Sequence, residues 1–237
     1  CLREVPAAEL VAWGADAGIF GAGWAPTVVP ESDILPAPPV ALIEAGQYNQ
    51  GPVIVGTNRN EWGLFQLIGA ADSVADTAGL YQYIDGTYPP ALATPLKALY
   101  APPSDALANA KLVELITDQV FRCPAREFAR RVQAMGSDVW LYSFDHLPAF
   151  HAMELPYVFG NPSATLAPVL NEAVRAAVQG YWTQFAYSGD PNQPPLPLWP
   201  KYDAQSDMSI SLQETPVVEQ GLAAGTCDFW SALSAGQ

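Results

Sequence analysis

The sequence predicts an α/β fold built around a mostly parallel sheet. Two short apolar runs, Val53–Gly56 and Val139–Phe144, lack polar alternation, which is typical of strands buried in a parallel sheet. The long stretch between the two runs is helical in character. Each run is followed by a loop that carries an acid or a histidine, and in open α/β sheets the chemistry is placed at the carboxyl ends of the strands.

The remaining elements follow from apolar spacing and from glycine and proline signals. A short helix is expected within residues 1–13, irregular backbone over residues 14–39, and a short alternating edge strand or hairpin arm at Met208–Leu212. Further helices are expected at Pro39–Gly46, within 66–134 with breaks near Asp85–Pro90 and Ala101–Ser104, at Asp105–Val120, Asp118–Met135 and Asn171–Tyr187, and at Asp228–Leu233. Residues 1–237 show no internal repeat and no domain boundary.

The composition excludes several classes of function. Half of the residues are hydrophobic and 14% are charged, which indicates a well-packed globular protein. The formal net charge of −14 argues against nucleic acid or an anionic membrane as a partner. No apolar run approaches the ~18 residues that a membrane span requires. The three cysteines form no Cys-x-x-Cys metal or redox pattern. No metal and no cofactor is expected.

Glu61 and one of the two histidines are the candidate catalytic groups. His146 follows a strand closely and His151 lies deeper in the same loop; either could be a general base or a packed or surface residue. Glu61 could cap the helix that follows it, or it could orient a histidine and stabilise the imidazolium. A zinc site formed by both histidines and Glu154 is not expected, because their spacing fits no zinc-binding helix.

Several segments together resemble the type B carboxylesterase and cholinesterase family. They are Pro52–Phe65, His151–Gly160, Tyr181–Asn192 and Leu198–Tyr202. The resemblance implies the α/β-hydrolase fold, of which this chain would be the C-terminal part with the last strands of a mostly parallel central sheet and flanking helices. It implies that Glu61 is the triad acid and His151 the general base, which leaves His146 without a catalytic role. Glu154 matches a family glutamate, and we expect it to be a buried, hydrogen-bonded support for the site.

The serine expected of such a family is missing from the sequence. Neither a Gly-x-Ser-x-Gly motif nor a glycine-rich oxyanion segment occurs in residues 1–237. We therefore expect residues 1–237 to be the C-terminal portion of one catalytic domain, completed by an N-terminal chain that supplies the serine and the oxyanion hole. The alternative is a non-catalytic cholinesterase-like module for binding or adhesion, because one fold can serve unrelated functions.

The resemblance also assigns the cysteines. Cys123 and Cys227 match positions that form a disulfide in the cholinesterase branch. Cys1 resembles the second cysteine of a small loop, so we expect a nick in that loop and a bridge from Cys1 to the N-terminal chain. Such bridges imply secretion or another oxidising compartment. The alternative is three reduced thiols within the core.

The segment Ile19–Pro26 resembles the acyl-pocket stretch of cholinesterases. Phe20 and Ala22 fall where that branch often has bulky aromatic residues. Alanine at one of these positions predicts room for acids longer than acetate in a small ester substrate, although Phe20 could equally be an ordinary core residue.

Overall fold

A single sheet of four strands organises the chain, with the strand order β1-β2-β3-β4. The computed structural model describes residues 4–9, 12, 35–161 and 170–234. The strands are β1 (Val53–Asn58), β2 (Val139–Phe144), β3 (Met208–Leu212) and β4 (Val217–Gln220). Strands β1, β2 and β3 are parallel, while β4 runs antiparallel to β3. The predicted α/β class with a mostly parallel sheet is therefore confirmed.

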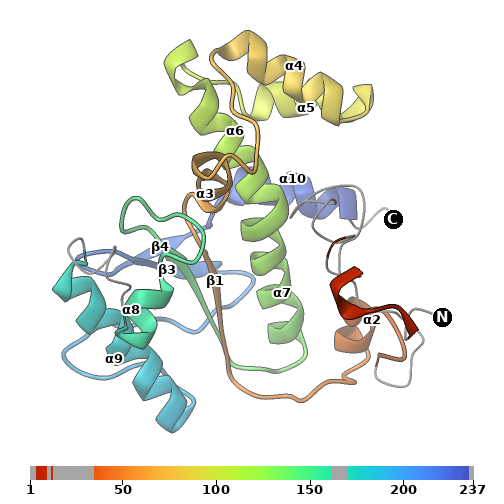
Figure 1. The fold of residues 1–237 in the computed structure, drawn as a ribbon. Helices are drawn as coiled ribbons and strands as arrows, with labels where there is room; N and C mark the ends of the chain where they lie inside the picture. Colours follow the sequence, from red (N-terminus) through yellow and green to blue (C-terminus); the bar gives the residue numbers. More distant parts are fainter. Residues whose placement is uncertain (1–3, 10–11, 13–34, 162–169, 235–237) are drawn as a thin grey trace.

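One face of the sheet is covered by α8 (Leu155–Phe159) and α9 (Glu172–Ser188) (Figure 1). Alternate residues of β2, including Trp140 and Phe144, point to this face and pack against Tyr157 of α8 and Tyr181 of α9. Helix α9 begins where the side chain of Asn171 accepts hydrogen bonds from the amides of the first turn, as an N-cap does.

The opposite face packs against α7 (Cys123–Ala134). Ala129 and Val132 of α7 contact Val139 and Leu141, the β2 residues that point away from α9. Every residue of β2 is buried, which explains why its sequence has no polar alternation. The short helix α2 (Pro39–Glu44) lies beside α7 (Figure 1).

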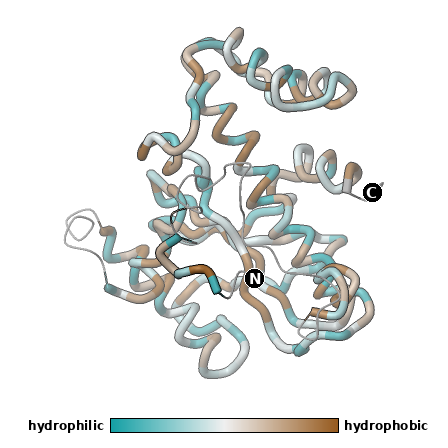
Figure 2. Tube along the Cα trace, turned by 45° about the vertical axis from the view of Figure 1, so that its right-hand side comes forward, coloured by the Kyte–Doolittle hydropathy of each residue, from teal (hydrophilic) through white to brown (hydrophobic). Residues whose placement is uncertain are grey.

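A separate cluster of helices extends from one end of the sheet. It contains α4 (Thr77–Thr87), α5 (Pro90–Leu99) and α6 (Ala108–Thr117), and its core residues are joined by Phe229 and Trp230 of α10 (Ala224–Ser234). In Figure 2 the chain alternates between hydrophobic and hydrophilic residues along these helices, as expected when one side of each helix is buried. No helix within the described residues is long and apolar enough to cross a membrane.

Some element boundaries differ from the sequence-based expectations. The single helix expected at Asp105–Val120 is divided into a 3-10 turn (Asp105–Leu107), α6 and a π-helical turn, η3 (Asp118–Arg122). Helix α4 continues to Thr87, and α10 begins at Ala224, before the expected start at Asp228. Met208–Leu212 is a hairpin arm and not an edge strand, because β4 pairs with its outer side. Of the helix expected within residues 1–13, residues 7–9 are helical, while residues 1–3, 10, 11 and 13 lie outside the described part of the chain.

Candidate active site

Two loops meet at the carboxyl edge of the neighbouring strands β1 and β2. The first leads from Asn58 into α3 (Glu61–Leu67), and the second runs from Asp145 to Glu154. Backbone hydrogen bonds join them: the amide of Arg59 donates to the carbonyl of Phe144 at 3.0 Å, and that of Asn60 to the carbonyl of Ala149 at 2.9 Å. Because the strands are parallel, the acid of one loop and the histidine of the other lie at the same edge.

Glu61 and His151 form a direct hydrogen bond. Nδ1 of His151 lies 2.7 Å from Oε2 of Glu61, and the backbone amide of Asn58 donates to Oε1 of Glu61 at 2.7 Å. A carboxylate can only accept hydrogen bonds, so with Glu61 ionised Nδ1 is the nitrogen that carries the proton. The other ring nitrogen, Nε2, is then free to accept one. The side chain of Glu61 is 7% exposed, whereas that of His151 is 42% exposed.

The alternative role of Glu61 as a helix cap does not describe its contacts. Asn60 occupies the N-cap position of α3 and makes no side-chain capping hydrogen bond. The Glu61 carboxylate instead binds the amide of Asn58, which precedes the helix, and the ring of His151.

Two aromatic rings pack against the imidazole of His151. The ring centroids of Phe65 and Phe121 lie 5.2 and 5.4 Å from that of His151. Phe65 comes from α3, on the same short helix as Glu61, and Phe121 comes from the π-helical turn η3. Neither residue was predicted as part of the site. The sequence does show that Phe65 lies one helical turn after Glu61, and this spacing indicates that the two side chains are neighbours. Nothing in the sequence indicates that Phe121 contacts His151.

Glu154 is hydrogen-bonded to Asn58, at the start of the loop that carries Glu61. The side-chain amide of Asn58 donates to Oε2 of Glu154 and, at 2.7 Å, to the carbonyl of Phe150 in the loop before His151. The expected hydrogen bonding of Glu154 is therefore present. The expected burial is only partial, because Glu154 is half-buried.

Sequence comparisons show the family of the chain. The model of the carboxylesterase family matches residues 1–230. This chain belongs to the carboxylesterase family. Human neuroligin-2 is 26% identical across 98% of this chain and 33% of its own length. Carboxylesterase 3 of Pongo abelii is also 26% identical, across 98% of this chain and 45% of its own length. The chain therefore spans less than half the length of these relatives, and its sheet and flanking helices are part of the α/β-hydrolase fold.

In this carboxylesterase-family chain, His146 is a packed residue. Its ring lies edge-on to Phe144 and Tyr157, with centroids 6.4 and 5.6 Å apart, and it is half-buried. Its backbone amide donates to the carbonyl of Leu212. The described residues contain no group of three or more metal-ligating side chains.

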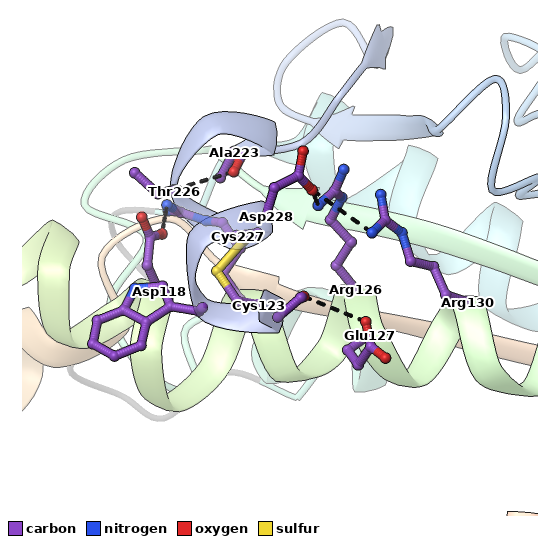
Figure 3. The surroundings of a disulfide bond; sticks show 12 residues. Asp118, Cys123, Arg126, Glu127, Arg130, Ala223, Thr226, Cys227 and Asp228 are labelled. Carbon is purple, nitrogen blue, oxygen red and sulfur yellow. Dashed lines mark hydrogen bonds and ion pairs between the residues drawn. A yellow bond between two sulfur atoms is a disulfide. The ribbon is translucent and has the colours of Figure 1, made fainter. Parts of the chain in front are cut away.

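Cys123 and Cys227 form a disulfide between the start of α7 and α10, with Cα atoms 4.8 Å apart (Figure 3). The alternative of three reduced thiols is therefore wrong for this pair. Beside the bridge, the buried Arg126 donates hydrogen bonds to Asp207 and Asp228. Cys1, Phe20 and Ala22 lie outside the described residues.

Burial raises the pKa of Glu61 above its ordinary value of 4.5, although the hydrogen bonds from Asn58 and His151 act in the opposite direction. Between 4.5 and this raised pKa, the unfolded chain has already lost a proton that the folded chain retains. The stability that protonated Glu61 contributes is therefore present below pH 4.5 and is lost as the pH rises through the folded-state pKa.

We expect Glu61→Gln to remove this loss of stability at higher pH. Glutamine cannot ionise, so the free energy of unfolding of the variant minus that of the wild type should increase as the pH rises from about 4 to 7. Urea denaturation at a series of pH values measures the difference. Glu172→Gln is a control of opposite sign, because the hydrogen bond from Arg175 lowers the pKa of Glu172. A difference for Glu61→Gln that is constant or falls with pH would contradict the prediction.

Proposed function

We propose that this chain is part of a carboxylic ester hydrolase with a Ser-His-Glu triad. Glu61 and His151 supply the acid and the base, and an N-terminal portion of the protein supplies the serine and the oxyanion hole. The observation that carries the proposal is the 2.7 Å hydrogen bond between Nδ1 of His151 and Oε2 of a buried glutamate. A buried acid that fixes the tautomer of a half-exposed histidine is the arrangement that activates a serine.

Each residue has a separate role in the proposed reaction. The serine hydroxyl attacks the ester carbonyl while Nε2 of His151 accepts its proton. Glu61 keeps the proton on Nδ1 and stabilises the imidazolium that forms. The same proton then passes to the departing alcohol, and a water molecule repeats the sequence on the acyl-enzyme to release the acid. Phe65 and Phe121 pack against the imidazole and keep it in the orientation in which Nδ1 faces Glu61 and Nε2 faces the serine.

The substrate and setting are further parts of the proposal. The substrate is a small ester. Because the segment Ile19–Pro26 resembles an acyl-pocket stretch and has alanine at position 22, the acyl group is longer than acetyl. The disulfide supports an oxidising compartment such as the exterior of the cell. Cys1 would link this chain to the N-terminal portion.

A non-catalytic binding module is the second candidate. The identity to neuroligin-2 equals that to carboxylesterase 3, so family membership alone does not select the enzyme. The hydrogen-bonded pair of Glu61 and His151 favours the enzyme, because a binding module has no need of a base poised in this way.

Labelling with a fluorophosphonate tests the choice between the two. The complete protein, including the N-terminal portion, should take up one phosphonyl group per molecule on a serine outside residues 1–237. His151→Ala should abolish rapid labelling and His146→Ala should not. Absence of labelling in the wild-type protein would favour the binding module and overturn the enzyme.

A further inference from the structure

The loop that carries Glu61 is held on both sides by one short segment, Thr117–Arg122. The backbone amide of Trp62, directly after Glu61, donates to Oγ1 of Thr117 at 3.2 Å. On the other side, Nη2 of Arg122 donates to the carbonyl of Arg59, two residues before Glu61, at 2.8 Å. The main chain around Glu61 is therefore fixed at two points by groups from outside the loop.

Arg122 is itself held by a buried carboxylate. Its Nη1 forms an ion pair with Oδ1 of Asp118, which is completely buried, and Arg122 is 8% exposed. The hydroxyl of Tyr100 donates to Oδ2 of Asp118 at 3.0 Å, and Nε1 of Trp230 donates to that hydroxyl at 3.0 Å. Asp118 lies beside the disulfide between α7 and α10 (Figure 3). The guanidinium thus has little freedom to turn away from the Arg59 carbonyl.

The π-helical turn explains how one segment reaches both sides of the loop. In a regular α-helix, residues five apart point about 140° away from one another. Residues Asp118–Arg122 instead form a π-helical turn, which widens the helix between α6 and α7. Such turns are rare and occur frequently at functional sites. The same turn presents Phe121 to the ring of His151.

We propose that Arg122 is a positioning residue for the triad: it fixes the Arg59 carbonyl and so directs the Glu61 carboxylate at Nδ1 of His151. This inference rests on the proposed esterase function. A purely structural ion pair would have no need of the second donor, since Asp118 accepts from Nη1 alone while Nη2 reaches the loop. Buried ion pairs are in any case weak evidence of stabilisation.

Arg122→Lys separates positioning from stability. Lysine keeps the positive charge for Asp118, but a single ammonium group lacks the planar fork that reaches the carboxylate and the carbonyl together. The matched control is Arg126→Lys, because Arg126 is also buried and pairs with Asp207 and Asp228 away from the site. In the complete protein, Arg122→Lys should lower kcat for ester hydrolysis by about 10- to 100-fold with little change in KM, because catalytic groups tolerate little displacement. Arg126→Lys should leave kcat within about 2-fold of the wild type, since it does not contact the loop.

Thr117→Val tests the second contact without altering a charge. Loss of the hydroxyl should also lower kcat, as Arg122→Lys does. Similar kcat values for Arg122→Lys and Arg126→Lys, at matched losses of stability, would overturn the positioning role.

A readout independent of catalysis keeps this inference distinct from the proposed function. The proton between Nδ1 of His151 and Glu61 should give a strongly downfield NMR resonance, and His146→Gln shows which histidine is responsible. Arg122→Lys should broaden or shift this resonance, whereas Arg126→Lys should not. A wild-type protein without esterase activity would refute the enzyme, and the resonance would still decide the role of Arg122: an unchanged resonance in Arg122→Lys overturns it.

Discussion

Replacement of His151 by glutamine should lower kcat for ester hydrolysis by about 10⁴- to 10⁶-fold, the range seen when a triad histidine is lost. Glutamine retains polarity and approximate size, and its amide can still face Glu61. It has no basic nitrogen, however, to accept the proton of a serine. The measurement is the steady-state hydrolysis of an activated ester by the complete protein.

His146→Gln is the matched control, because His146 is the other histidine of the chain and lies in the same loop. Its ring packs against Phe144 and Tyr157, so its loss should reduce stability slightly and leave kcat nearly unchanged. Equal losses of activity in the two variants would show that the loop is sensitive to any substitution and that His151 has no special role.

Removal of the disulfide should have the largest effect on stability. Cys123 and Cys227 are 104 residues apart, and in the chain-entropy model a bridge that closes a loop of about 100 residues stabilises a fold by about 4.7 kcal/mol. The double variant Cys123→Ala/Cys227→Ala should therefore unfold at a markedly lower urea concentration than the wild type.

Reduction of the wild-type protein provides an independent control for the disulfide. Urea denaturation with a thiol reductant should reproduce the midpoint of the double variant, and the reductant should not shift the variant further. A loss below about 1 kcal/mol would indicate that the unfolded chain gains little freedom when the bridge is absent.

The sequence predicted the parts of the structure that depend on local pattern. The apolar run Val139–Phe144 coincides with β2, because a strand buried on both faces needs no alternation. Glu61 and His151 were found through their motifs, and their contact follows from the parallel pairing of β1 and β2. The disulfide partners were likewise assigned from resemblance to known positions.

Other features depend on tertiary contacts that no local pattern records. Strand β4 is exposed along its whole length, so its four residues have neither the apolar run nor the alternation of a strand. The sequence pattern predicts continuous helix over Asp118–Arg122, where the structure has a π-helical turn. Phe121 and Arg122 reach the site only because this turn widens the helix, and the sequence alone therefore gives them no functional signal.

A crystal structure of the complete protein would measure the distance on which the proposed function depends, from the hydroxyl oxygen of a serine outside residues 1–237 to Nε2 of His151. We predict a separation of about 2.6–3.2 Å, with Oε2 of Glu61 still bound to Nδ1. A structure in which Nε2 faces solvent or apolar side chains, with no serine hydroxyl within reach, would contradict the esterase.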